Sequence, residues 1–235
     1  MSADADALRL LKCGEIAVEG RMPWASNATF LVNLVDNGET KAQAIYKPVR
    51  GERPLWDFPP GLHRRELAAY RLSAALGWDI VPPTVVRDGP LGEGSFQLFV
   101  PSDFEQHYFT LHEHRPELHD RLRTICAFDL VANNTDRKGG HCLLGLDGRV
   151  YAIDNGLCFA ASFRLRTVIW EFAGETVPQP IRTDLARLAK KVPLDVASLL
   201  SDEEVEALRS RAAALVARPT FPGDPTGHRY PWPLV

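Results

Sequence analysis

Two aspartates near the middle of the chain, Asp136 and Asp154, constrain the fold most, because they flank a segment with the pattern of a short β-hairpin. The predicted strands are residues 142–144 and 150–153, and residues 145–148 carry an Asp-Gly turn signal. Backbone pairing would hold the loop before the hairpin beside the residues after it. Two carboxylates in one cleft repel each other and need a cation between them, for which Mg²⁺ with a polyphosphate is the obvious candidate.

Length and composition limit the class of protein. The 235 residues suffice for one large domain or for two small lobes that share a cleft. A hydrophobic content of 45% is ordinary for a globular protein, and the net charge of −3 argues against a nucleic-acid partner. No apolar run reaches the roughly 20 residues of a membrane span, and no signal-peptide pattern opens the chain. The four cysteines form no CxxC pair, which favours reduced thiols in a cytoplasmic protein.

The first hundred residues read mainly as β-structure, and residues 8–36 are expected to contain an opening pair of strands. The predicted strands are residues 13–19, 28–35, 41–47, 84–87 and 95–100, and one helix is predicted over residues 60–76. A Pro- and aromatic-rich insert, residues 49–60, fits either a lid or partner site or a segment that packs on the outside of the sheet.

Glu66 lies in the middle of the apolar face of the predicted helix. A carboxylate buried there alone would cost several kcal/mol, so it must find a cation or hydrogen-bond donors. Lys47, at the end of an apolar strand, can supply the charge. The alternative is a local pair of Glu66 with Arg65 or Tyr70.

The second part of the chain reads as helical around the hairpin. The predicted helices are residues 116–133, 183–191 and 202–217, and the tail from Pro219 is irregular. The division expected from these patterns is an N-terminal lobe of residues 1–100 and a C-terminal lobe of residues 101–235. Four clustered histidines fit a metal site less well than a solvated, partly helical linker, because their spacing matches no zinc signature. They are His107, His112, His114 and His119.

The sequences Asn134-Thr-Asp-Arg137 and Ile153-Asp-Asn-Gly156 resemble the catalytic and metal-binding loops of the phosphatidylinositol 3-/4-kinase-related, atypical kinase-like family. The chain looks like a small actinobacterial-type member, and the resemblance covers roughly residues 25–160. It implies an α+β, two-lobed protein-kinase-like fold with a five-stranded N-lobe sheet and a reduced helical C-lobe. It also implies ATP and Mg²⁺ or Mn²⁺ as cofactors.

The resemblance assigns roles to the residues of both loops. Asp136 would orient the incoming hydroxyl or accept its proton, and Lys138 would neutralise charge on the γ-phosphate. Arg137 would be either a structural partner of its loop or a phosphate contact, and Asp154 would bind the metal.

The N-terminal half would hold the nucleotide. Lys47 and Glu66 would hold the α- and β-phosphates. The adenine would bind main-chain atoms between Leu98 and Val100, just before a hinge. Ser26 and Asn27, in a turn that lacks the G-x-G-x-x-G pattern, would be left to contact the phosphates, although such a turn is more often a surface turn. These assignments follow from the family, not from spacing.

His141 departs from the family pattern, because kinases place a metal-binding Asn at this position. A neutral imidazole suits Mn²⁺ better than Mg²⁺. Three alternatives remain: a single metal, a second metal bound with the help of His141, or substitution by Asn133, Asn134 or Asn155. An inactive, nucleotide-binding relative is also compatible with the change.

The function predicted from these features is transfer of the γ-phosphate of ATP to an unidentified hydroxyl acceptor, which can be a lipid, a protein or a small molecule. The alternatives are a nucleotide-binding pseudokinase that regulates a partner, and an AMP transferase on the same scaffold. A hydrolase that uses the two aspartates leaves Lys47 and Glu66 without roles. The sequence does not indicate an oligomeric state.

Overall fold

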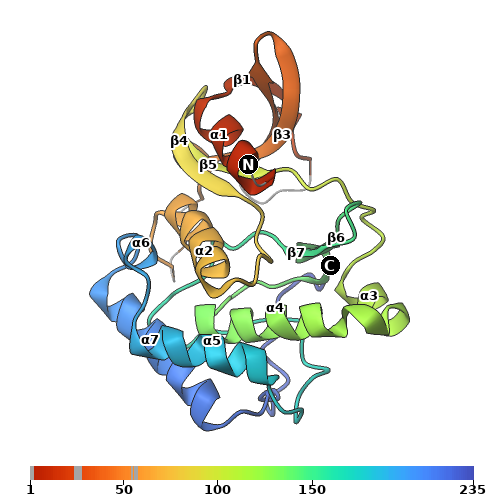
Figure 1. Ribbon diagram of the computed structural model, residues 1–235, viewed down its shortest axis with the longest axis vertical. Coiled ribbons are helices and arrows are strands. Elements are labelled where there is room, and N and C mark those ends of the chain that lie inside the picture. The colour runs from red at the N-terminus through yellow and green to blue at the C-terminus, as the bar shows by residue number, and fades with distance from the viewer. Residues whose placement is uncertain (1–2, 24–27, 54, 56–57) are drawn as a thin grey trace.

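The computed structural model describes residues 3–23, 28–53, 55 and 58–235, and it separates into a β-rich N-terminal part and a helical C-terminal part (Figure 1). The N-terminal part contains a five-stranded antiparallel sheet in the order β1-β2-β3-β5-β4. Its strands are β1 (Glu15–Arg21), β2 (Phe30–Asp36), β3 (Glu39–Pro48), β4 (Thr84–Gly89) and β5 (Gly92–Leu98). The five predicted strands are therefore present, with shifted ends.

The chain opens with a helix where strands were expected, so the prediction for residues 8–13 was wrong. Helix α1 (Ala3–Cys13) carries Asp4 and Asp6 in its first turn and Lys12 in its last, a charge order that suits the helix dipole. Leu11 is fully buried against the sheet, together with Val32 and Leu34 of β2. Burial of a helical face thus decides the structure of this short segment.

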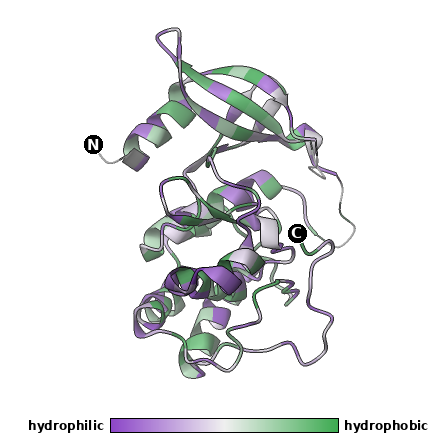
Figure 2. Cartoon of the chain, turned by 90° about the vertical axis from the view of Figure 1, so that its right-hand side faces the viewer, coloured by the Kyte–Doolittle hydropathy of each residue, from purple (hydrophilic) through white to green (hydrophobic). Residues whose placement is uncertain are grey.

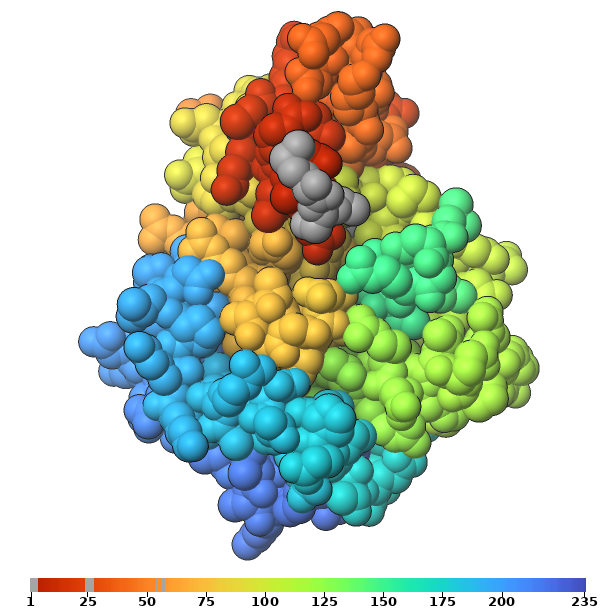
Figure 3. Space-filling model, viewed as in Figure 1, coloured from red at the N-terminus to blue at the C-terminus, as the bar shows by residue number. Residues whose placement is uncertain are grey.

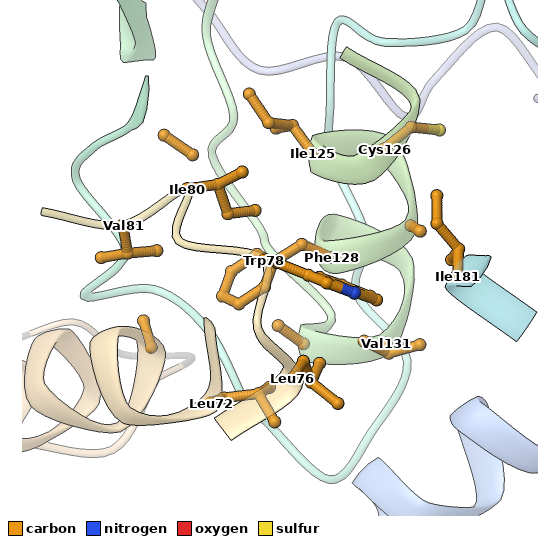
Figure 4. Close-up of a cluster of buried hydrophobic side chains, with 14 of the residues drawn as sticks. Leu72, Leu76, Trp78, Ile80, Val81, Ile125, Cys126, Phe128, Val131 and Ile181 are labelled. Carbon is orange, nitrogen blue, oxygen red and sulfur yellow. The ribbon is translucent and has the colours of Figure 1, made fainter. Parts of the chain in front are cut away.

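Helix α2 (Leu62–Leu76) matches the predicted helix and joins the two parts. Gly77 ends it in the left-handed conformation, with φ of 71°, and the next amide, Trp78 N–H, donates to the carbonyl of Ser73 at 3.0 Å. The buried side chains of α2 pack into the C-terminal core, and Figure 4 shows Leu72 and Leu76 beside Phe128. In the space-filling view α2 lies between the sheet and the C-terminal helices (Figure 3).

The C-terminal part has one hydrophobic core, to which α4 (His119–Ala132) contributes its buried side chains together with the remaining elements. Those elements are α3 (Tyr108–His114), β6 (Cys142–Leu144), β7 (Val150–Ala152), α5 (Gln179–Lys190), α6 (Leu194–Ala197) and α7 (Asp202–Ala217), with 3₁₀ turns at Val49–Gly51, Pro116–Leu118 and Gly139–His141. The helix predicted from residue 116 therefore begins as a 3₁₀ turn. Helix α7 begins at the predicted capping box, in which Ser201 and Glu204 bond each other's amides.

The result is an α+β, two-lobed protein-kinase-like fold with a five-stranded N-lobe sheet and a small helical C-lobe, as expected (Figure 2). The division at residue 100 stays a prediction, and α2 bonds physically to both sides of it. Three cysteines are buried, Cys13 is exposed, and all four are free. Among the described helices none is long and apolar enough to cross a membrane.

Candidate functional site

The β6–β7 hairpin brings the two predicted motifs together. Cys142 pairs with Ala152, and Ile153 N–H donates to the carbonyl of His141 at 2.9 Å, which extends the pairing by one step. His141 and Asp154 therefore lie side by side, with Nε2 and Oδ2 3.5 Å apart. The backbone of Asp154 is left-handed, with φ of 57°, a conformation that Asp adopts more readily than most residues. The hairpin prediction is confirmed.

Arg137 is the buried centre of this region, and its side chain has no exposed surface. Its guanidinium donates to both oxygens of Asp129 on α4, at 3.1 and 2.9 Å, to the carbonyl of Ile153 at 2.6 Å and to Oδ1 of Asn155 at 2.7 Å. Burial opposes the charge, but the Asp129 carboxylate outweighs it and raises the pKa of Arg137. Of its two expected roles, the geometry favours the structural partner, because a fully buried side chain does not reach a phosphate.

Lys47 stands between two carboxylates that come from different parts of the chain. Its Nζ lies 2.5 Å from Oε1 of Glu66 and 2.8 Å from Oδ1 of Asp154. The predicted Lys47–Glu66 pair is thus observed, whereas Arg65 binds Glu204. Burial opposes the charge of Lys47, and the two carboxylates overcome it and raise its pKa. The second oxygen of Glu66 accepts the amide of Asn155 at 3.0 Å, so α2 contacts the post-hairpin segment directly.

Asp136 and Lys138 belong to the Asp136 loop, residues 133–141, which follows α4. Burial raises the pKa of the Asp136 carboxyl to about 6, against the opposing charge of Lys138, whose Nζ is 3.5 Å away. At neutral pH Asp136 is therefore ionised but retains appreciable basicity, which suits a group that orients a hydroxyl or accepts its proton.

A cavity of about 490 Å³ collects these side chains between the sheet and the Asp136 loop. Its walls include Lys47, Glu66, Asp136, Lys138, His141 and Asp154. Burial lowers the pKa of His141 to about 4, against the charge of Asp154, so the imidazole is neutral at physiological pH, and its Nδ1 accepts the amide of Lys138 at 3.4 Å. The convergence expected of lysine, glutamate and two aspartates is observed.

The donor set fits a magnesium or manganese ion that is carried by a nucleotide. Within the described residues, no group of three or more His, Cys, Asp or Glu side chains could hold a metal by itself, and this applies to the histidines of residues 107–119 as well. Mg²⁺ is usually held by one or two carboxylates together with substrate phosphates. Asp154, with His141 beside it, provides that smaller set.

Among the predicted nucleotide contacts, one pair does not line this cavity and another pair lies outside the described residues. Leu98 and Val100 are absent from its walls, and the amide of Leu98 already donates to the carbonyl of Pro83 at 2.8 Å. An adenine that bound the N–H of Leu98 would have to break this hydrogen bond. An adenine contact is therefore left to other main-chain atoms of the segment. Ser26 and Asn27 lie outside the described residues, as do Pro54, Trp56 and Asp57 of the insert.

Except for Lys138, sequence reasoning missed the wall of the cavity beyond Asp136. This wall, called here the distal wall, consists of Thr135, Lys138, Leu157, Arg164, Arg166 and Trp232. Trp232 comes from the irregular tail, whose Leu234 carbonyl accepts the amide of Gly139 at 2.7 Å. No local pattern in the sequence indicates that the tail returns to the Asp136 loop, and Figure 1 shows the C-terminal end beside β7.

Solved structures that are similar to this chain include kinases. The chain matches the Golgi casein kinase with Mn/ADP bound at a TM-score of 0.59 and 16% identity, over 99% of this chain and 80% of that one. It matches hydra Fam20 with sugar at a TM-score of 0.59 and 15% identity, over 93% of this chain and 90% of that one. It matches the Helicobacter pylori proinflammatory kinase CtkA at a TM-score of 0.52 and 14% identity, over 89% of this chain and 94% of that one. At these identities the likeness establishes an atypical kinase-like fold.

The family follows from a curated relative. Protein Rv2133c of Mycobacterium tuberculosis (strain ATCC 25618 / H37Rv) is 41% identical over 271 aligned positions, which cover 99% of this chain and 97% of the relative. The chain therefore belongs to the same family as protein Rv2133c. No family model matches the chain.

Proposed function

We propose that the protein is an atypical kinase-like phosphotransferase that moves the γ-phosphate of ATP to a hydroxyl acceptor. One observation carries the proposal: Lys47 contacts both Glu66 and Asp154 at the cavity that also contains Asp136. A lysine–glutamate pair, a metal-binding aspartate and a base are the parts that kinases use for phosphoryl transfer. The relation to phosphatidylinositol 3-/4-kinases belongs to the same proposal and rests on the two sequence motifs.

Each residue has a defined task in this reaction. Lys47, oriented by Glu66, binds the α- and β-phosphates, and Asp154 with His141 holds Mg²⁺ or Mn²⁺. When bound, the metal neutralises charge on the phosphates. Asp136 takes the proton of the acceptor hydroxyl, and the oxygen of that hydroxyl forms a bond to the γ-phosphorus. The bond between the γ-phosphorus and the bridging oxygen breaks at the same time, and ADP keeps that oxygen. Lys138 balances the charge on the transferred group, and Arg137 fixes the loop from below.

The remaining assignments complete the proposal. The adenine would lie against the segment from Leu98 to Val100 and contact backbone groups that the sheet leaves available. The four free cysteines suit a reducing compartment, and we place the protein in the cytoplasm on that ground.

The test combines nucleotide binding with label transfer. Calorimetry should show ADP binding that requires Mg²⁺ or Mn²⁺ in the wild type and in Asp136→Asn. Label from [γ-³²P]ATP should appear in an acceptor with the wild type, and Asp136→Asn should lower this rate by about 10²–10⁴-fold.

Two results would contradict the proposal. Nucleotide binding with no transfer to any acceptor would identify a binding module, and label transfer from [α-³²P]ATP would identify transfer of AMP. Asp136→Asn removes the charge and keeps the shape of the side chain, so loss of folding can be recognised by comparing ADP affinities.

A further inference from the structure

The cavity has a second group of lining residues, the distal wall, of which the proposed nucleotide contacts use only Lys138. Three of its six members are cations: Lys138, Arg164 and Arg166. The carboxylates of the nucleotide half are already paired, because Lys47 holds Glu66 and Asp154. The other lining carboxylates are Glu52, which accepts the amides of Gly61 and His63, and Asp136, which lies 3.5 Å from Nζ of Lys138.

Main-chain pairing fixes Arg166 next to the Asp136 loop. The amide of Arg166 donates to the carbonyl of Asn134 at 2.9 Å, and its carbonyl accepts the amide of Arg137 at 3.1 Å. A parallel bridge between Arg137 and Thr167 continues this pairing. The backbone from which Arg166 projects is therefore held in register with that of Asp136.

Side-chain alternation directs Arg166 into the cavity. Arg137 and Thr167 both point inward, since each bonds the buried carboxylate of Asp129. Their neighbours Asp136 and Arg166 consequently project from the opposite side of the pair, and both line the cavity. No hydrogen bond or ion pair with another described residue engages the guanidinium of Arg166.

The tail supplies an apolar side chain to the same cavity. Its backbone is fixed at both ends, because Thr167 N–H donates to the carbonyl of Arg229 at 3.1 Å and Gly139 N–H donates to that of Leu234 at 2.7 Å. Between these bonds Trp232 lines the cavity with 86% of its surface exposed. An exposed indole beside arginines binds a ligand that has both an apolar face and a negative charge.

We propose that the acceptor is a hydroxyl compound that already carries an anionic group, with a phosphate matching the cations of the distal wall best. This inference rests on the proposed function. Arg166 binds the anionic group, Trp232 covers the carbon skeleton, and the free hydroxyl lies at Asp136. The acceptor oxygen then bonds the γ-phosphorus, its proton passes to Asp136, and ADP leaves with the electrons of the broken P–O bond. The compound can be soluble or the headgroup of a lipid, because the chemistry recognised is the same.

The experiment separates acceptor pools by charge. Extracts of cells that express the protein are divided into small molecules, lipids and proteins, and the first two pools are split on an anion exchanger into retained and unretained fractions. Each fraction is incubated with [γ-³²P]ATP, Mn²⁺ and the full-length protein. Label in the retained small-molecule or retained lipid fraction supports the inference and identifies which source supplies the acceptor.

Variants then test the assigned residue. Arg166→Gln should raise the KM for the labelled anionic acceptor about tenfold or more, and the affinity for ADP should change less than about twofold. Arg187→Gln is the matched control, because Arg187 is an exposed residue of α5 that pairs with Asp184. Trp232→Ala should also raise the KM for the acceptor, with unchanged affinity for ADP.

Failure of the inference is distinguishable from failure of the proposed function. Label only in the unretained fractions or in proteins overturns the anionic acceptor and supports a phosphotransferase. An unchanged KM in Arg166→Gln overturns the assignment as well. Absence of label in every pool, with ADP still bound, overturns the proposed function and this inference with it.

Discussion

At the scale of single residues, the ammonium group of Lys47 lies between two carboxylates of the cavity. Glu66 is only 3% exposed, and Asp154 belongs to a segment more than a hundred residues away from Lys47. Two carboxylates brought this close would repel each other, and a cation between them removes the repulsion. The side chain that we assign to nucleotide binding therefore also stabilises the free protein.

Replacing Lys47 by methionine should lower the free energy of unfolding by about 2–4 kcal/mol, because it leaves Glu66 buried without its cation. It should also abolish detectable ADP binding. Urea denaturation and calorimetry measure the two effects. Lys41→Met is the control on the same strand, because Lys41 is exposed and pairs with Glu39, and it should change stability by less than about 1 kcal/mol. Equal losses in both variants would contradict the role of the buried pair.

The raised pKa of Asp136 predicts the pH dependence of the reaction. The carboxylate accepts a proton only when ionised, so kcat/KM should rise with pH and level off above about 6. Lys138 favours the ionised form, and Lys138→Gln should therefore raise the pKa of Asp136 and move this rising limb to higher pH. Steady-state rates between pH 5 and 8 in the two proteins provide the comparison. A limb that stays at the same pH would exclude Asp136 as the titrating group.

At the scale of elements, the Asp136 loop is held by α4 below it and by the hairpin beside it. Asp129 of α4 and the carbonyl of Ile153 after the hairpin both bind the guanidinium of Arg137. One side chain thus joins three segments, so the position of Asp136 depends on a residue that does not line the cavity.

Arg137→Met should lower the free energy of unfolding by about 3–5 kcal/mol, because it leaves Asp129 buried and unpaired. Adding Asp129→Asn should recover part of this loss, since the double variant leaves no charge alone. Chemical denaturation of the two single variants and the double variant forms a thermodynamic cycle. Strictly additive losses would show that the two side chains do not act as a pair.

The elements that sequence could predict are those fixed by neighbours in the chain. The hairpin follows from an Asp-Gly turn between apolar strands, and α2 follows from its apolar face and Gly77. The pairing of Lys47 with Glu66 was also predictable, because a carboxylate on an apolar face needs a cation.

Features that depend on distant packing escaped prediction. Helix α1 is short, and burial of Leu11 against the sheet stabilises it. Arg166 reaches the cavity because its backbone pairs with residue 137, and Trp232 reaches it because the tail returns to Gly139. Periodicity in the sequence carries no information about such long-range returns.

At the scale of the whole molecule, α2 connects the two lobes through its own side chains. Arg65 donates to the carbonyl of Cys158 at 2.7 Å and pairs with Glu204 at the start of α7, and the next residue, Glu66, reaches Lys47 of the sheet. Two adjacent residues of α2 thus form contacts with opposite lobes. The placement of Glu66 depends on the C-terminal helices.

Arg65→Met should therefore weaken ADP binding severalfold, although Arg65 does not line the cavity, and should lower the free energy of unfolding by about 3–5 kcal/mol by leaving Glu204 unpaired. Arg64→Met is the matched control, because Arg64 is the exposed preceding residue of α2 and should be neutral. Calorimetry and urea denaturation of both variants make the comparison. Undiminished ADP affinity in a destabilised Arg65→Met protein would refute the coupling.

The double anchorage of α2 has a consequence for control. Many kinases are switched off by a swing of the corresponding helix, which parts the lysine from the glutamate. Here Lys47 and Glu66 are in contact, and Arg65, the residue before Glu66, attaches the helix to Glu204 of α7. For the proposed phosphotransferase we therefore expect a lysine–glutamate pair that stays closed, so that activity depends on the amounts of acceptor and of protein.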